Sequence, residues 1–283
     1  MDFRPASEAD LEAEYEVFNM AEGEVCRRHS FPWEDPPFEA FAAPHRHLLA
    51  RDAERAFVAE EDDRVVAFSA AFVRGANWFL SALFVQPDFQ GRGVGSRLLD
   101  LSWDGEYDRR ITITDSIQPV SNGLYAQRGL IPTTPILHLE GTPRADHPPG
   151  LEPGSLEPRA LAALDRAAYG FERAADHIYW AESAARRTLW ERRGEPVAYS
   201  YARPGRIGPI AGRDPRGAAD ALRAEFARSG DEEVLVQVPG SAFELVEAAL
   251  AAGLRFTDAP GLLLLSRAVE APRALAISNY WLL

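Results

Sequence analysis

The stretch Leu83-Phe84-Val85-Gln86-Pro87-Asp88-Phe89-Gln90-Gly91-Arg92-Gly93-Val94-Gly95-Ser96 decides the fold of this chain. An apolar segment, Trp78–Val85, leads into it and has the composition of a strand buried on both faces. An apolar helical pattern, Val94–Trp103, follows at once. Glycine allows backbone conformations that other residues avoid, so several N–H groups of the loop can turn toward one point. Together with the positive end of the helix dipole, these N–H groups make an anion site suited to a diphosphate.

Two common diphosphate motifs do not fit this loop. A Walker loop requires Gly-Lys-Ser or Gly-Lys-Thr, and the chain contains no lysine. A Rossmann fingerprint requires G-x-G-x-x-G after a βαβ unit, whereas Gly91, Gly93 and Gly95 form G-x-G-x-G without such a unit before them. A tight turn that needs its glycines for geometry alone is the remaining structural interpretation.

Two motifs resemble the GCN5-related N-acetyltransferases, the GNAT superfamily. The pattern V-x-P-x-x-Q-G-x-G-x-G-S resembles the acyl-CoA loop of that family, with Gln90, Gly93 and Gly95 at the family's Gln/Arg-x-x-Gly-x-Gly/Ala positions. Residues 121–130, Ser-Asn-Gly-Leu-Tyr-Ala-Gln-Arg-Gly-Leu, resemble the family's helix that ends in Leu-Tyr-x-x-x-Gly-Phe, with Leu130 in place of the usual Phe. The resemblance covers about residues 2–140 in element order.

The resemblance implies a binding site and an acid. It implies a bulged, splayed strand at Leu83–Val85, whose backbone pairs with the pantetheine arm of acetyl-CoA. It places Tyr125 near the thioester sulfur, where the phenol would protonate the departing thiolate and act as a catalytic group. The cofactor contacts are expected from Leu83, Phe84, Val85, Gln90, Gly91, Arg92, Gly93, Val94, Gly95, Ser96 and Asn122.

The general base is less well determined by the sequence. An attacking amine must lose a proton, often through water to a carboxylate. Many family members carry a Glu on the strand before the glycine loop, but Trp78–Val85 contains no acid. Asp115, which follows the strand Ile111–Thr114, is the first candidate. Glu22, Glu24 and the region 29–35 are alternatives, and each is more often a solvated surface group.

The pattern of elements predicts an α/β (α+β) fold with two tandem GNAT-like domains, each a mixed, mostly antiparallel sheet flanked by helices. A helix followed by Gly-Leu recurs at Gly129-Leu130 and at Gly253-Leu254, which indicates a distant repeat with a period near 124. The Pro- and Gly-rich segment 141–155 reads as a linker. The expected division is a catalytic, acetyl-CoA-binding domain at 1–140, this linker, and a degenerate GNAT-like domain at 156–283.

The second half lacks the glycine loop. Where that loop should follow a strand, the chain reads Ile210-Ala211-Gly212-Arg213-Asp214-Pro215-Arg216-Gly217. Asp214 would repel a phosphate, and Pro215 removes an N–H donor. Ala249 stands at the offset that matches Tyr125. We therefore expect one acetyl-CoA site per chain.

Composition bounds the partners and the location. The net charge of −13 argues against nucleic acid. No apolar run approaches the ~20 residues of a membrane helix, and the N-terminus lacks a signal-peptide pattern, so a cytoplasmic protein without membrane contact is expected. Cys26 is the only cysteine and reads as a small apolar residue. His45 and His47 lack metal-binding spacing, so no metal is expected.

The charge is uneven along the chain. Residues 1–140 carry 13 Arg against 24 acidic residues, which would attract a cationic amine, although a solvated surface is the simpler interpretation. The predicted function is transfer of an acetyl group from acetyl-CoA to a primary amine of a small molecule by direct attack. A non-catalytic acyl-CoA sensor and a protein N-terminal acetyltransferase are the alternatives. The sequence leaves open whether the protein forms a homodimer.

Overall fold

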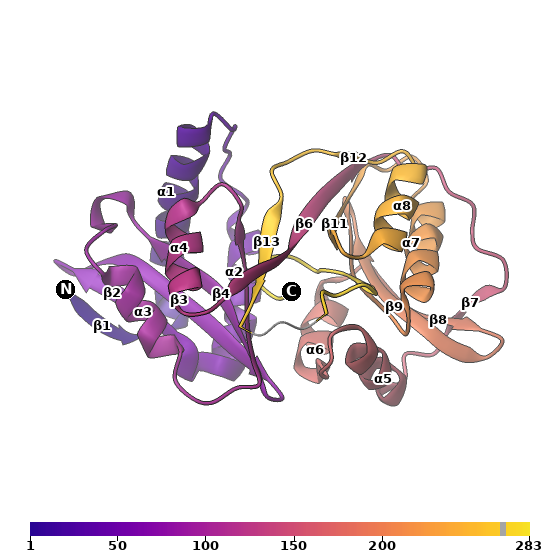
Figure 1. The fold of residues 1–283 in the computed structure, drawn as a ribbon, viewed down its shortest axis with the longest axis horizontal. Helices are drawn as coiled ribbons and strands as arrows, with labels where there is room; N and C mark the ends of the chain where they lie inside the picture. Colours follow the sequence, from indigo (N-terminus) through magenta and orange to yellow (C-terminus); the bar gives the residue numbers. More distant parts are fainter. Residues whose placement is uncertain (267–269) are drawn as a thin grey trace. The chain divides into compact units, whose positions relative to one another are not determined.

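A computed structural model describes residues 1–266 and 270–283 (Figure 1). Contacts between Cα atoms divide the chain into two compact units. Of the described residues, unit 1 comprises 1–113, 117–131 and 265–266, and unit 2 comprises 114–116, 132–264 and 270–283. Neither unit is one continuous segment.

Unit 1 is a sheet with helices on both faces. Its strands follow the order β1-β2-β3-β4-β5, and the neighbours are antiparallel except for the parallel pair β4–β5. The strands are β1 (Asp2–Pro5), β2 (Ala56–Glu61), β3 (Arg64–Arg74), β4 (Asn77–Val85) and β5 (Arg109–Asp115), the last two residues of which belong to unit 2. The helices are η1 (Glu8–Asp10), α1 (Leu11–His29), α2 (Phe38–Asp52), η2 (Ala53–Arg55), η3 (Pro87–Phe89), α3 (Val94–Ser102) and α4 (Pro119–Gln127).

The alternation of side chains along β3 and β4 builds two cores. The ring of Phe84 packs edge-on against Phe18 of α1 at 5.1 Å and stacks with Phe68 at 5.4 Å, so these even-numbered positions face α1 and α2. Ala67 faces the other way and joins the buried cluster that includes Leu98 of α3. The sheet of unit 1 therefore lies between α1 and α2 on one face and α3 on the other (Figure 1).

The first helix begins with a capping box. The backbone N–H and the hydroxyl of Ser7 both donate to the carboxylate of Asp10, at 2.8 and 2.9 Å. This capping box leads through the 3₁₀ turn η1 into α1. At the other end of α1, Ser30 takes a left-handed conformation with φ 61° and ends the helix before the proline-rich segment that separates it from α2.

Unit 2 repeats the element order of unit 1. Its sheet order is β13-β6-β11-β10-β9-β8-β7, with β12 on β6, β14 on β10, and a parallel pair β10–β11. The strands are β6 (Ile131–Gly141), β7 (Leu151–Gly154), β8 (Arg186–Arg192), β9 (Glu195–Arg203), β10 (Arg206–Gly212), β11 (Val234–Pro239), β12 (Arg255–Phe256), β13 (Gly261–Leu265) and β14 (Leu275–Ala276). The helices are α5 (Pro158–Ala168), α6 (Ala174–Ser183), α7 (Pro215–Ser229) and α8 (Phe243–Ala251).

Strand β9 separates two different interiors in unit 2. Ala198 and Ala202 face α7 and α8 and belong to an apolar core. Tyr199 and Tyr201 point to α5 and α6 and reach a buried polar network, in which the Tyr199 hydroxyl donates to the carboxylate of Asp165 at 2.8 Å. The predicted fold class is confirmed, since each unit is a mixed, mostly antiparallel sheet flanked by helices.

The compact units do not follow the predicted domain boundaries. Strand β6 lies in the segment expected to end the first domain, but from Pro132 onward it belongs to unit 2, because it pairs with β11 over Ile136–Gly141. The expected linker 141–155 contains β7, which pairs with β8. Backbone pairing, which local composition does not report, assigns these segments to the second sheet. None of the helices in the described ranges, 1–266 and 270–283, is long and apolar enough to span a membrane.

Candidate functional site

The glycine loop of unit 1 has the backbone that its sequence predicts. Gly91 and Gly93 take left-handed conformations, with φ of 73° and 82°, and Gly93 is the residue that caps α3. A Cβ atom at either position would meet no atom within 4 Å. These two glycines are therefore needed for backbone conformation, because L-residues avoid this region, and the space beside them is open.

The N-terminus of α3 offers unpaired donors. Arg97 N–H donates to the Gly93 carbonyl at 3.0 Å and begins the helical hydrogen-bond pattern, so the N–H groups of Val94, Gly95 and Ser96 come before it. No side chain of the described residues caps this helix, and its first turn carries no acid. The helix dipole adds partial positive charge at the same place. The arrangement suits a phosphate group.

Strand β4 opens away from β5 just before the loop. The two strands pair in parallel over Asn77–Leu80, and the pairing with β3 shifts register there because Ser81 is an extra residue in β4. The bulge thus lies at Ser81, two residues before the predicted Leu83–Val85. The predicted splay at Leu83–Val85 is present, since these residues pair with β3 on one side and lie beyond the end of the pairing with β5.

The side chains of the opened strand pack into the protein. Phe84 belongs to the aromatic cluster under α1, whereas Leu83 and Val85 pack on the α3 side. Gln90 turns back, and its Nε2 donates to the Val85 carbonyl at 2.9 Å. This bond ties the loop to the end of β4. The guanidinium of Arg92 lies over the ring of Phe89, 5.2 Å from the centroid.

Tyr125 lies on α4 and is buried, with 4% of its surface exposed. Burial raises the pKa of its phenol, and the nearby carboxylate of Glu22 raises that pKa further. The phenol therefore stays protonated at neutral pH. Helix α4 ends where Gly129 takes a φ of 78°, and the N–H of Leu130 donates back to the Tyr125 carbonyl at 3.0 Å.

Two other predicted contact residues bond within the protein. The side-chain Nδ2 of Asn122 donates to the Gln118 carbonyl at 2.8 Å, within the first turn of α4. The hydroxyl of Ser96 accepts from Arg128 Nη2 at 2.9 Å, and Arg128 also pairs with Asp100 at 2.6 Å. The two bonds of Arg128, the residue that follows α4, join the end of α4 to α3, so the helix with the loop and the helix with Tyr125 are held together.

The candidate bases fall in different places. Asp115 belongs to unit 2, whereas Tyr125 belongs to unit 1. Within unit 2, burial is the main cause of the raised pKa of Tyr280, and the charge of Asp115 raises that pKa further. Glu24 is paired with Arg27 and Arg28 of its own helix at 2.6 and 2.7 Å. Glu22 is half-buried on α1, and it is the carboxylate whose charge raises the pKa of Tyr125.

The two histidines that we set aside as metal ligands are both buried in α2. The His45 ring nitrogen Nδ1 lies 2.7 Å from the Phe41 carbonyl, and burial lowers the pKa of His45 to about 4. Within residues 1–266 and 270–283, no group of three or more His, Cys, Asp and Glu side chains is placed to hold a metal ion.

Unit 2 has a closed counterpart of this site. The Asp214 carboxylate accepts from the Gly217 N–H at 2.8 Å and so caps α7 itself. Strand β10 shifts register after Ile207, at the place that corresponds to the opening of β4. Strand β14 pairs there with β10, residues 210 and 211 opposite 276 and 275, and fills the opening with the chain's own backbone. None of these three features was predicted from the sequence.

Comparisons with known proteins were made for sequence and for fold. The sequence model of the acetyltransferase (GNAT) family matches residues 18–129. No curated protein sequence matches the chain significantly. Among solved structures, a proposed acetyltransferase of Pyrococcus horikoshii is similar with a TM-score of 0.77 and 18% identity, over 99% of this chain and 95% of that one.

Two further solved structures share the fold. A GCN5-related N-acetyltransferase of Sphaerobacter thermophilus has a TM-score of 0.66 and 17% identity, over 96% of this chain and 98% of that one. The GCN5-related glucosamine N-acetyltransferase region of a fungal multi-domain β-N-acetylglucosaminidase has a TM-score of 0.64 and 14% identity, over 93% of this chain and 38% of that one. At these identities the similarity concerns the fold.

Proposed function

We propose that residues 18–129, the segment that the acetyltransferase (GNAT) family model matches, form a domain that transfers the acetyl group of acetyl-CoA to a primary amine of a small molecule. One observation carries the proposal. The uncapped N-terminus of α3, led by Gly91 and Gly93 in left-handed conformations, adjoins a strand that has opened away from its neighbour. A diphosphate and an extended arm need these two features side by side.

The binding mode follows from the two features. The diphosphate of acetyl-CoA would accept hydrogen bonds from the N–H groups of residues 91–96 at the loop and the start of α3. The pantetheine amides would pair with the backbone of Leu83–Val85 on the edge that β5 leaves. The acetyl thioester would then lie near the opening at Ser81, where backbone N–H groups could stabilise the oxyanion that forms.

The reaction needs a base and an acid. The neutral amine attacks the thioester carbonyl, an N–C bond forms, the C–S bond breaks, and the amine proton leaves, through water to a carboxylate. The thiolate of CoA takes a proton from Tyr125, whose raised pKa keeps the phenol protonated. Within unit 1, Glu22 is the carboxylate whose charge raises the pKa of this phenol. We propose Glu22 as the base, with the sequence-based candidate Asp115 as the alternative.

Calorimetric titration of acetyl-CoA tests the binding site. Wild type is expected to bind one equivalent per chain, because Asp214 and β14 close the counterpart site in unit 2. Gly93→Asp is expected to lose binding, since it places a negative charge and an unfavourable φ in the diphosphate site. Gly75→Asp is a matched control, because Gly75 has a φ of 58° and lies at the other end of β4. Equal affinity of the Gly93 and Gly75 variants, or two equivalents per chain, would contradict the assignment.

The base can be identified from pH profiles of kcat/KM. Glu22→Gln is expected to lower kcat/KM about 10²-fold near neutral pH and to remove the acidic limb of the profile. Glu24→Gln, two residues along the same helix and engaged by two arginines, serves as the control and should leave the profile unchanged. If Asp115→Asn alone removes the acidic limb, the base is Asp115 and the role proposed for Glu22 is wrong.

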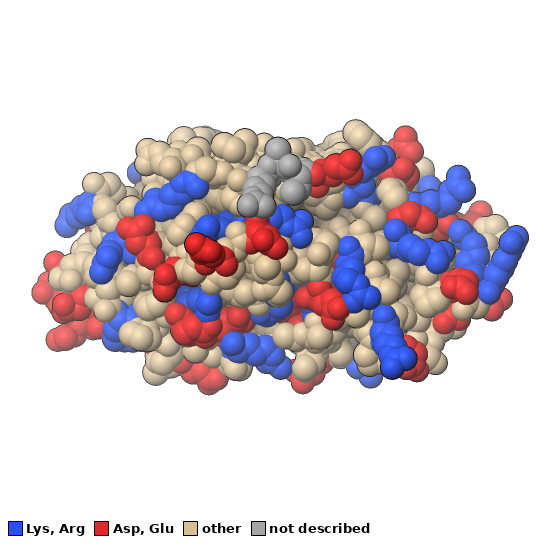
Figure 2. All heavy atoms as spheres, turned by 60° about the horizontal axis from the view of Figure 1, so that its bottom comes forward, with Lys and Arg blue, Asp and Glu red and all other residues tan. Residues whose placement is uncertain are grey.

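The acceptor is proposed to be a small, cationic amine. The acidic balance of the first half favours a positive substrate. On the face drawn in Figure 2, acidic and basic side chains are interspersed, so attraction would have to come from acids close to the site. The fungal neighbour is described as a glucosamine N-acetyltransferase region, which is a precedent for a small amine on this fold. Turnover with a panel of small amines and peptides separates this proposal from an N-terminal acetyltransferase, and no turnover with any of them would favour a sensor.

A further inference from the structure

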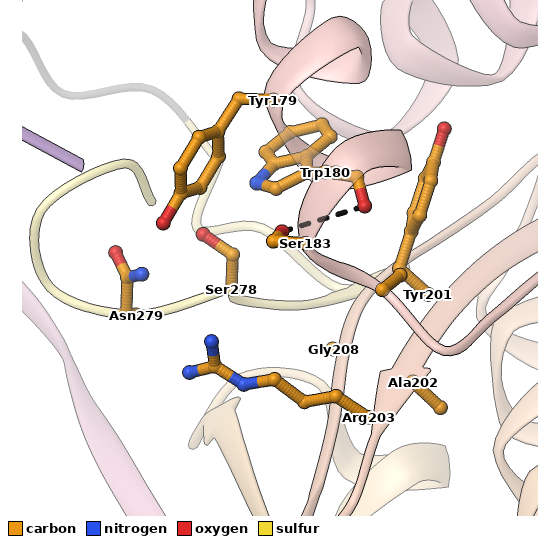
Figure 3. A pocket seen from close by; sticks show the side chains of 10 residues that line it. Tyr179, Trp180, Ser183, Tyr201, Ala202, Arg203, Gly208, Ser278 and Asn279 are labelled. Carbon is orange, nitrogen blue, oxygen red and sulfur yellow. Dashed lines mark hydrogen bonds between the residues drawn. The ribbon is translucent and has the colours of Figure 1, made fainter. Parts of the chain in front are cut away.

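Unit 2 contains a pocket that the proposed reaction does not use. It lies between α6, the end of β9, β10 and the segment after β14 (Figure 3). The side chains that matter for its chemistry are Tyr179, Trp180, Tyr201, Arg203, Ser278 and Asn279. Aromatic rings therefore form one wall, and polar groups form the opposite one (Figure 3).

The pocket wall holds hydrogen-bond donors that need an acceptor. Trp180 is 2% exposed, and its indole Nε1–H is shielded from solvent without a hydrogen-bond partner among the described residues. A buried donor without an acceptor is rare and costly in folded proteins. Asn279 uses its Oδ1 to accept from the N–H groups of Trp281 and Leu282, both at 2.9 Å, which leaves its Nδ2 directed toward the pocket (Figure 3).

Two arginines bring positive charge to the same place. The guanidinium of Arg203 extends across the mouth of the pocket below Tyr179 and Asn279 (Figure 3). Arg206 lies close behind, where its Nε donates to the Ser278 carbonyl at 2.8 Å and its Nη2 donates to the Gln237 side chain. Neither arginine forms an ion pair with any described residue. Burial, together with the smaller effect of repulsion from Arg203, lowers the pKa of Arg206 to about 10.

The acidic side chains in this part of unit 2 do not line the pocket. The carboxylate of Asp258 lies 3.9 Å from the ring of His138. After the larger effect of burial, the charges of Asp115 and Asp258 raise the pKa of Tyr280. The acid beside Trp180, Asp176, is fully buried and paired with Arg173 at 2.9 Å. The pocket lining therefore combines the guanidinium of Arg203 with at least two N–H donors and contains no acidic side chain, and Arg206 lies behind it against the Ser278 carbonyl. The oxygen of Leu283 accepts from the N–H and the hydroxyl of Ser278, both at 3.4 Å, and from Arg173 at 3.1 Å, so it is already engaged. The lining of the pocket therefore lacks a side-chain acceptor with negative charge.

We propose that this pocket binds a small molecule through a carboxylate or phosphate group, held by the guanidinium of Arg203 and the indole N–H of Trp180. The anion would offset the repulsion between Arg203 and Arg206 and would accept the hydrogen bond that Trp180 now lacks. The rings of Tyr179, Trp180 and Tyr201 would cover a flat apolar part of the ligand. Acetyl-CoA binding at the glycine loop does not enter this inference.

Titrations with sodium benzoate and with inorganic phosphate test the proposal. The two probes separate a carboxylate on a ring from a bare oxyanion, and benzyl alcohol is the neutral counterpart of benzoate. At least one anion is expected to bind saturably and to shift the indole N–H resonance of Trp180, which the loss of one signal in Trp180→Phe identifies. Arg203→Gln is expected to weaken binding about 10- to 100-fold, since it removes a charge-assisted hydrogen bond.

Arg216→Gln is the matched control, because Arg216 is exposed in unit 2 and does not line the pocket. It should bind the anion as wild type does. The proposal is overturned if neither anion binds at millimolar concentration, if benzyl alcohol binds as tightly as benzoate, or if Arg203→Gln binds with unchanged affinity. Each of these outcomes leaves the acetyl-CoA titration unaffected, so the failure of this inference can be told apart from failure of the proposed function.

Discussion

Tyr125→Phe is expected to lower kcat about 10²-fold and to leave the affinity for acetyl-CoA nearly unchanged. The substitution removes the proton that the CoA thiolate would receive, but it keeps the ring that fills the buried position. Since the pKa of Tyr125 is raised above its ordinary value of 10.0, ionisation of this phenol should not reduce the rate of wild type below pH 10. Steady-state kinetics from neutral to alkaline pH, together with calorimetric binding of acetyl-CoA, measure both quantities.

Tyr107→Phe is the control for this change. Tyr107 lies in the same unit, and its hydroxyl donates to the Asp104 carbonyl at 2.9 Å on the surface. It loses the same atom without touching the proposed site, so its kcat should equal that of wild type. Unchanged kcat in the Tyr125 variant across the pH range would mean that another group, or solvent, protonates the thiolate.

Glu14 makes the stability of the protein depend on pH. The residue is 3% exposed on α1, and burial, with a smaller effect of Asp10, raises the pKa of its carboxyl to about 8. In the unfolded chain the pKa returns to about 4.5. Between these values the folded state keeps a proton that the unfolded state releases, so rising pH favours unfolding by up to about 1.4 kcal/mol per pH unit.

Glu14→Gln is therefore expected to unfold at higher denaturant concentration than wild type at pH 8, with the difference shrinking toward pH 5. The full effect is on the order of 3–5 kcal/mol, because linkage sums over the interval between the two pKa values. Urea titrations at several pH values measure it. Glu12→Gln, an exposed position on the same helix, should show no such trend. Parallel pH dependence of wild type and the Glu14 variant would show that Glu14 ionises in the folded state as it does in the unfolded chain.

The sequence predicted those parts of the fold that depend on interactions between residues close together in the chain. The left-handed conformations at Gly91 and Gly93 follow from residue type and spacing. The apolar run Trp78–Val85 predicted β4 within one residue of its start, since a strand covered on both faces needs no polar alternation.

The features that were missed depend on distant partners. Nothing at Ser81 marks a bulge, because the bulge arises from the register between β3 and β4. Strand β8 begins at Arg186, only three residues after α6 ends at Ser183, and no Gly or Pro marks the boundary between them. The two-residue strand β14 exists only because β10 offers it an edge.

The same reason limits the prediction of the site. The loop residues 90–96 are adjacent in sequence, so their convergence could be anticipated from a single motif. Glu22 and Tyr125 lie on α1 and α4, and only the packing of the two helices in unit 1 brings the carboxylate within electrostatic reach of the phenol. Candidate acids on separate elements look equivalent in a single sequence, so the choice between Asp115 and Glu22 stays a prediction that the pH profiles test.

Unit 1 includes Leu265 and Ser266, and this has a consequence for the order of folding during synthesis. The N–H of Arg110 donates to the Ser266 hydroxyl at 2.8 Å, and the Ser266 N–H donates to the Arg110 carbonyl at 3.0 Å, although the two residues are 156 positions apart. A ribosome that adds about 5–20 residues per second needs roughly 7–27 s to go from residue 131 to Ser266. For that time the nascent unit 1 keeps an open edge at β5, with backbone groups available to any other strand. A chaperone that shields this edge would therefore act in the interval between the two halves of translation.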